Sequence, residues 1–97
     1  MIPFLRLYPT GHVMEERISR GPLVERMAGR FMDNGGRYMI CIRDSLEVEL
    51  VAAMPVGPGQ FEKLAEATCY NDPHLPMAID QLVRDSINEM ERRLALH

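Results

Sequence analysis

The fold is decided by residues 35–54, GGRYMICIRDSLEVELVAAM. Apolar side chains recur at every second position in both halves of this stretch: Tyr38, Ile40, Ile42, Leu46, Val48, Leu50 and Ala52. A period of two residues is typical of a strand with one buried face. The stretch therefore predicts a β-hairpin, and we expect the rest of the chain to cover it.

The charges of this hairpin constrain its turn. A two-residue loop would set Ile40 opposite Glu49, which would bring a carboxylate onto the apolar face. A three-residue loop at 43–45 sets Ile40 opposite Val48 and keeps the apolar residues together. We predict the odd-length loop, although no glycine stands where such loops favour one.

Helical spacing of apolar residues appears on both sides of the hairpin. The first helix is predicted at about 22–33, because Pro22 suits a first turn and Asn34-Gly35-Gly36 a helix end. The second is predicted at about 76–95, where a long apolar stripe ends near two arginines.

Three further stretches complete the sheet in this reading. Residues 4–8 (FLRLY) predict a strand, at a sheet edge because prolines flank it. Residues 12–20 and 61–69 each fit a strand or a helix. We favour a strand for 12–20, where His12, Met14, Glu16 and Ile18 could share one face, and for 61–69, since a lone hairpin is marginal. Residues 55–59 are expected to be a stiff connector.

These elements predict one domain over residues 1–97, of the α+β class. Its small antiparallel sheet is built on the 37–54 hairpin and packed by helices at about 22–33 and 76–95. The chain is 46% hydrophobic and 26% charged, which favours folding over disorder.

The composition also indicates the expected location of the protein in the cell. No apolar run approaches the roughly 18 residues of a membrane span, and the start MIPFLRLYP does not resemble a signal peptide. The two cysteines make no disulfide framework. We expect a cytoplasmic protein with no membrane contact.

The net charge of -3 hides an asymmetry between the two parts of the chain. Residues 1–43 hold seven arginines and four acids, whereas residues 44–97 hold four bases and ten acids. Spaced carboxylates could engage a basic partner surface, although a solvated face is the simpler reading. The candidate partner-binding residues are Glu47, Glu49, Asp80, Asp85, Glu89 and Glu91.

No residue set predicts catalysis, a metal site or a cofactor. Cys69, Asp72 and His74 lie within six residues, but a metal site needs three or four converging ligands and no second pair is visible. Cys41 is expected on the strand face opposite Ile40, as a structural thiol. We therefore expect no enzyme and no cofactor.

Nucleic-acid binding is also disfavoured. The expected order from 22 to 95, α-β-β-β-α, resembles that of double-stranded-RNA-binding domains. That family carries a lysine cluster at the start of its second helix, and residues 74–80 contain no lysine. Acids interleave with the arginines of residues 15–33, so no direct nucleic-acid contact is expected.

Small size, ten arginines to one lysine and no enzymatic motif are the remaining features. In these the chain is similar in kind to small accessory proteins of bacteriophages and mobile elements, which include anti-CRISPR inhibitors. The resemblance covers no specific stretch. It implies a non-enzymatic binding protein that inhibits or regulates a host protein or protein complex. The alternatives are a structural homo-oligomer, for example a homodimer, and a module that binds a small ligand or nucleic acid.

Overall fold

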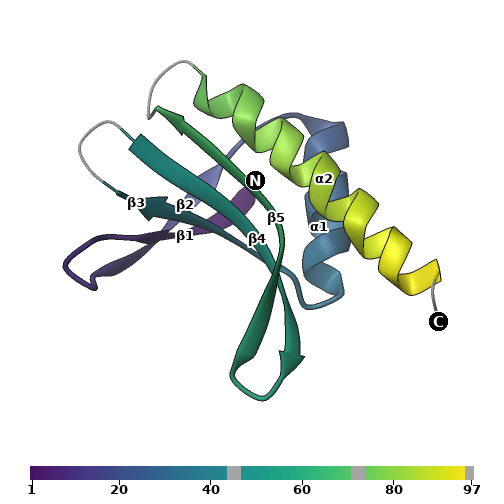
Figure 1. The fold of residues 1–97 in the computed structure, drawn as a ribbon. Helices are drawn as coiled ribbons and strands as arrows, with labels where there is room; N and C mark the ends of the chain where they lie inside the picture. The colour runs from purple at the N-terminus through teal and green to yellow at the C-terminus, as the bar shows by residue number, and fades with distance from the viewer. Residues whose placement is uncertain (44–46, 71–73, 96–97) are drawn as a thin grey trace.

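The computed structural model describes residues 1–43, 47–70 and 74–95. In order, the elements are β1 (Ile2–Leu7), β2 (Val13–Ile18), α1 (Pro22–Asp33), β3 (Arg37–Ile42), β4 (Glu47–Gly57), β5 (Gln60–Tyr70) and α2 (Leu75–Ala95). The strands form one sheet in the order β2-β1-β3-β4-β5 (Figure 1). The predicted α+β class is confirmed, and both helices agree with their predicted bounds to within one residue.

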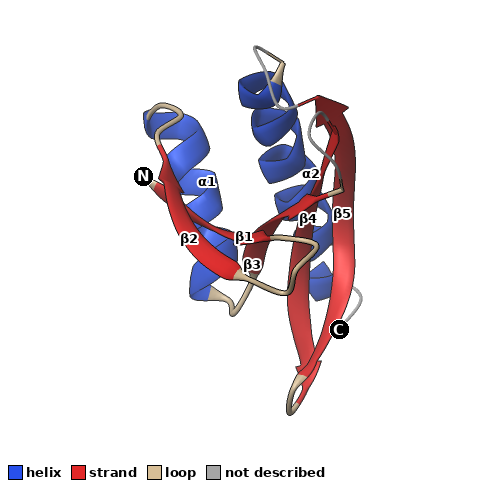
Figure 2. Cartoon of the chain, turned by 90° about the vertical axis from the view of Figure 1, so that its left-hand side faces the viewer, coloured by secondary structure: helices blue, strands red, loops and turns tan. Residues whose placement is uncertain are grey.

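The two helices lie on the same side of the sheet. Figure 2 shows them behind the strands, with β1, β2 and β3 in front. Within the described residues, no helix covers the front face. The domain therefore has two layers, and one side of its sheet is uncovered.

The sheet is antiparallel except where β1 meets β3. These two strands run parallel, with Phe4 beside Tyr38, and α1 makes the crossover that a parallel pair requires. β1 is thus an inner strand, and its predicted place at an edge is wrong. The prolines do not prevent this, because Pro3 precedes the residues that pair with β3 and Pro9 follows the end of the strand.

The hairpin of β3 and β4 has a different register from the predicted one. Ile40 pairs with Leu50 and Ile42 with Val48, so the predicted pairing of Ile40 with Val48 is wrong by two residues. A shift of two leaves every side chain on its predicted face, so the hydrophobic pattern does not distinguish the two registers. The predicted loop itself includes Asp44 and Ser45, which lie outside the described residues.

Both ambiguous stretches are strands, as β2 and β5. Residues 55–59, predicted as a connector, instead end β4 and turn into β5, and Gly59 adopts a φ of +69° in that turn. β3 stops pairing at Ala53, so the end of the β4–β5 hairpin projects beyond the other strands (Figure 1).

The core fills the space between the sheet and the helices. At its centre the Tyr38 ring lies 5.4 Å from the Phe4 ring of β1 and 5.0 Å from the Phe31 ring of α1. The Tyr38 hydroxyl lies 2.8 Å from Ser86 Oγ of α2. One side chain therefore joins both helices to the sheet.

Candidate functional site

The uncovered face of the sheet has an apolar centre. Strand register sets Leu5 beside Met39 and Met39 beside Val51, while Leu7 lies beside Cys41 in the next row. Leu5 is 37% exposed, although leucine side chains in a sheet are usually buried. These residues alternate with the core residues of the same strands, which is why they face away from the helices.

A β-bulge in β5 adds an aromatic ring to this face. Ala52 pairs with Ala65 but Ala53 pairs with Lys63, so Leu64 is an extra residue in the ladder. One extra residue in a strand moves the side chains beyond it to the opposite faces of the sheet. Lys63 and Phe61 therefore join the uncovered face, where Phe61 is 56% exposed.

The same bulge turns Glu62 toward the helices. Arg93 of α2 donates to Glu62 from its Nη1, at 2.6 Å. This hydrogen bond holds the pKa of Glu62 below its ordinary value. The pairing confirms independently that Phe61 and Lys63, on either side of Glu62, point the opposite way.

Two neighbouring hollows share residues of this face. Leu5, Arg37, Met39 and Phe61 line the smaller, of about 210 Å³. The larger, of about 400 Å³, shares Leu5 and Arg37 with it but is also lined by Phe4, Tyr38 and Met32, which belong to the helix-covered side of the sheet. Their walls are mostly apolar, so together they form a continuous depression that could receive apolar side chains. We call it the sheet-face depression.

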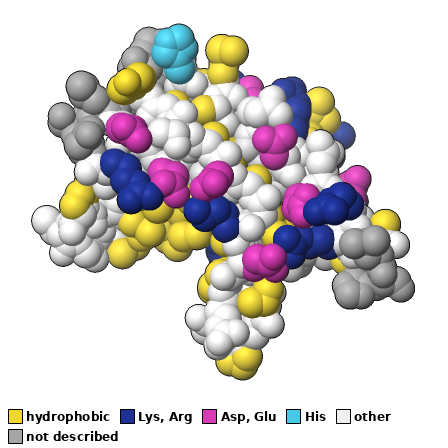
Figure 3. Space-filling model, in the orientation of Figure 1, with side chains coloured by type: hydrophobic (Ala, Val, Ile, Leu, Met, Phe, Trp, Pro, Cys, Tyr) yellow, Lys and Arg dark blue, Asp and Glu magenta, His cyan; other side chains and the backbone are white. Residues whose placement is uncertain are grey.

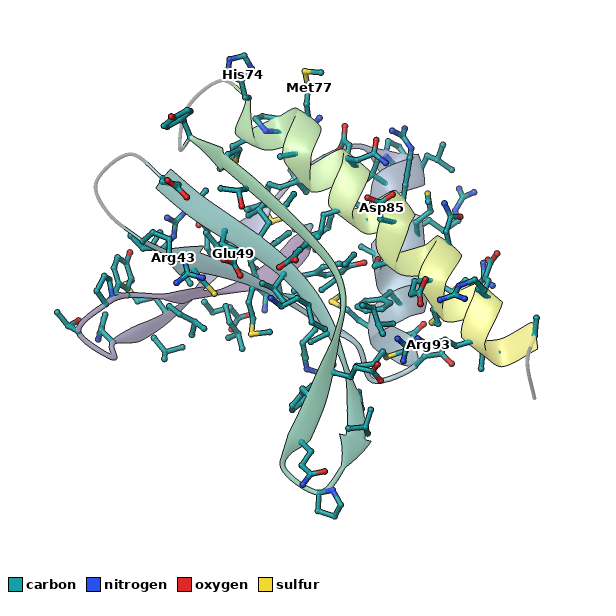
Figure 4. The ribbon with its side chains drawn as sticks, viewed as in Figure 1. Arg43, Glu49, His74, Met77, Asp85 and Arg93 are labelled. Carbon is teal, nitrogen blue, oxygen red and sulfur yellow. The ribbon has the colours of Figure 1, made fainter. Side chains whose placement is uncertain are left out.

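Charged side chains border the depression. Figure 3 shows hydrophobic side chains beside a row of acidic and basic ones, and in Figure 4 Arg43 and Glu49 point toward one another. Arg43 donates to Glu49, which lowers the pKa of that carboxyl. Lys63 lies 3.6 Å from Glu49 and 2.7 Å from Glu66.

Arg37 differs from these paired cations. It is exposed, and the one hydrogen bond that its side chain makes to a described residue goes from Nη1 to the Gly36 carbonyl at 2.8 Å. No carboxylate of the described residues forms an ion pair with it. Because its side chain lines both hollows, a positive charge is available beside an apolar surface.

The six predicted partner-binding carboxylates divide between two elements. Glu47 and Glu49 stand on β4, at positions that face away from the core. The other four stand on α2, which covers the opposite face of the sheet. The structure therefore does not bring the six together, and their role in binding stays a prediction.

Most of the α2 carboxylates already bind within the chain. Asp80 accepts two hydrogen bonds of 2.9 Å from Arg20, which precedes α1. Glu91 lies 2.7 Å from Arg30 of α1. Glu89 accepts hydrogen bonds from Arg92 and Arg93, whereas Asp85 is exposed and accepts one from Gln81. These pairs hold α2 in place, so a partner would have to compete with them.

The surroundings of Cys41 do not activate its thiol. Cys41 is half-buried on the uncovered face. Its burial is the larger cause that raises the pKa of its thiol, and the nearby charge of Glu49 raises it further. Because the thiolate is the reactive form, this environment disfavours a nucleophile. Cys69 and His74 line a shallow hollow of about 300 Å³ with Glu47. Asp72, the third predicted ligand candidate, lies outside the described residues, and no metal-binding group of three occurs among the described ones.

Sequence reasoning missed the residues that make the depression. The alternation in β3 placed Cys41 opposite Ile40, and by the same rule it would have placed Met39 there. The positions of Leu5 and Phe61 had no such signal, because Leu5 depends on the parallel pairing of β1 and Phe61 on the bulge at Leu64.

None of the helices among the described residues combines the length and apolar character of a membrane span.

Comparisons with known proteins add no further assignment. The chain matches no protein-family model and no curated protein.

Proposed function

We propose that this chain is a non-enzymatic protein-binding protein that acts through the sheet-face depression, as an inhibitor or regulator of a host protein complex. The observation that carries the proposal is the uncovered face itself. It presents exposed apolar side chains, Leu5 and Phe61, around a depression large enough for side chains of a partner. Contiguous exposed apolar surface with a polar border is typical of interaction sites.

The charges around the depression suit a protein surface better than a nucleic acid. Lys63 and Arg43 are neutralised by neighbouring carboxylates, and Arg17 lies 3.7 Å from Glu15. A nucleic-acid site needs an uncompensated basic surface to bind phosphates. An apolar centre with a mixed polar rim is instead the anatomy of a protein–protein interface.

Arg37 adds a specific expectation about the partner. It lines both hollows and forms no ion pair with a carboxylate of the described residues. A partner that sets a carboxylate against Arg37 and an apolar side chain beside Phe61 would use both features. The resemblance in kind to phage accessory proteins makes a host complex the first place to look.

The test is affinity capture from nuclease-treated host lysate with three baits. Wild type is compared with Phe61→Glu, which places a charge in the depression, and with Met77→Glu. Met77 is 72% exposed on α2 and points away from the sheet (Figure 4). We expect wild type and Met77→Glu to capture the same partner in near-stoichiometric amount, and Phe61→Glu to lose most of it.

Two results would overturn the proposal. Capture that disappears after nuclease treatment would indicate binding through nucleic acid. Equal capture by Phe61→Glu and wild type, with loss for Met77→Glu, would move the interface to α2. Circular dichroism of each bait establishes that the substitutions leave the fold intact.

A further inference from the structure

Strand β2 forms one edge of the sheet and pairs on its outer side with no described strand. Tyr8 N donates to His12 O where the β1–β2 hairpin closes. Hydrogen-bonded and non-hydrogen-bonded pairs alternate from there. Val13, Glu15 and Arg17 are consequently the residues whose N–H and C=O groups point outward. Such an edge is a template for another strand.

The side chains of this edge are complementary to themselves. Glu15 and Arg17 are 52% and 69% exposed, and both point to the uncovered face. If an antiparallel copy pairs Glu15 with Arg17, symmetry creates two oppositely charged pairs. A shift of two residues in either direction would instead set Glu15 against Glu15 or Arg17 against Arg17, and would lose both oppositely charged contacts between the copies, leaving Glu15 with only the Arg17 of its own strand, 3.7 Å away.

The side chains of β2 that point to the helix side are compatible with the same register. Met14, which is 50% exposed, would stand opposite Ile18 of the second copy. The two Glu16 side chains would meet at the centre, but each is already bound by Arg6, whose Nε lies 2.8 Å from Glu16 Oε2. Each carboxylate would therefore enter the contact with its own cation.

We propose that two copies of this chain pair through β2, antiparallel, with Glu15 of each copy opposite Arg17 of the other. Twofold symmetry on Glu16 joins the two five-stranded sheets edge to edge into one continuous sheet. The axis runs perpendicular to the sheet, so both sheet-face depressions open on the same side. The dimer does not depend on the proposed function, but it would present two binding surfaces to one partner complex.

The experiment measures the mass of the full chain by light scattering over a range of concentrations at low salt. Glu15→Arg and Arg17→Glu each replace attraction by repulsion in both pairs. We expect each to weaken dimerisation by roughly tenfold or more. The double variant, Glu15→Arg with Arg17→Glu, restores opposite charges and should recover the dimer.

Matched controls carry the same charge changes elsewhere. Asp33→Arg and Arg26→Glu reverse exposed charges of α1 that form no ion pair with a described residue. Both should keep the wild-type dimer. A monomeric wild type at the highest concentration reached would overturn the proposal, and so would single variants that dimerise as the controls do.

A second measurement needs no variant. Hydrogen exchange of wild type, followed at the amides of Glu15 and Arg17, should slow as the concentration rises, because those N–H groups become bonded in the dimer. Exchange at these amides that is independent of concentration would contradict pairing through β2, even if another dimer forms.

Discussion

At the scale of single residues, the Tyr38 hydroxyl has the most specific surroundings in the core. Tyr38 is 1% exposed and Ser86 is fully buried. Ser86 donates its one hydroxyl hydrogen to the Val83 carbonyl at 2.7 Å, so the Tyr38 hydroxyl must be the donor toward Ser86 Oγ. Burial raises the pKa of Tyr38 to about 12, which keeps it protonated in this role.

This directionality predicts an asymmetry between two substitutions. Ser86→Ala leaves the buried Tyr38 hydroxyl without an acceptor and should cost about 2 kcal/mol of unfolding free energy. Tyr38→Phe leaves Ser86 bonded to Val83 and should cost about 1 kcal/mol. Urea denaturation of the two variants measures both values. A larger loss for Tyr38→Phe would contradict the assigned donor.

A second prediction concerns Gly36, which lies between α1 and β3. A Cβ at this position would stand 2.3 Å from Cε2 of Phe31, whose ring is fully buried. Gly36→Ala should therefore destabilise the fold by about 1–3 kcal/mol through overpacking.

Gly29→Ala is the matched control for Gly36→Ala. A Cβ at Gly29 meets no atom within 4 Å, and the residue lies inside α1. Alanine there should stabilise the helix by about 0.5–1 kcal/mol. The two variants are compared by thermal and urea unfolding, and equal effects in the same direction would refute the packing explanation for Gly36.

At the scale of elements, the attachment of α2 to β5 depends on pH. Arg93 donates to Glu62 and to Glu89. Its hydrogen bond lowers the pKa of Glu62, and the pKa of Glu89 is lowered by Arg92 first and by Arg93 second. A lowered folded-state pKa gives stability that is present above the ordinary carboxyl pKa and lost as the pH falls through the folded-state value. The melting temperature should therefore decline as the pH falls below 4.5, the ordinary carboxyl pKa.

Arg93→Gln tests this dependence. Without the guanidinium, Glu62 loses its hydrogen-bonding cation and Glu89 retains only Arg92. We expect a lower melting temperature near neutral pH and a shallower decline in acid than in wild type. Arg84→Gln, an exposed arginine of the same helix with no ion pair to a described residue, should keep the wild-type slope. Parallel curves for all three proteins would exclude this contribution.

The elements also show what a sequence pattern can and cannot predict. The helix at 22–33 was predictable because its start, apolar stripe and end are all local signals. The pairing of Ile40 with Leu50 was not, because hydrophobic alternation is unchanged by a shift of two residues.

The candidate site was harder to predict than the fold for the same physical reason. Leu5 reaches the depression through the parallel pairing of β1 with β3, a contact between segments far apart in the chain. Phe61 reaches it because Leu64 is bulged, and the residues 61–69 alone carry no signal of that bulge. The charges, in contrast, were visible in the sequence, but their intramolecular partners were not.

At the scale of the whole molecule, the two helices and the aromatic core lie on one side of the sheet, and the smaller hollow, which Phe61 lines, opens on the other. Substitutions in the smaller hollow can therefore alter binding with little effect on the core. Phe61 stands on the projecting end of the β4–β5 hairpin, where its 56% exposure makes replacement tolerable.

The most direct test of docking through the uncovered face is site-specific photo-crosslinking in host cells. Benzoylphenylalanine replaces Phe61 in one protein and Met77 in a control protein. Docking through the depression predicts a covalent adduct with one host complex from position 61 and little or none from position 77. An adduct from position 77, with none from position 61, would contradict it.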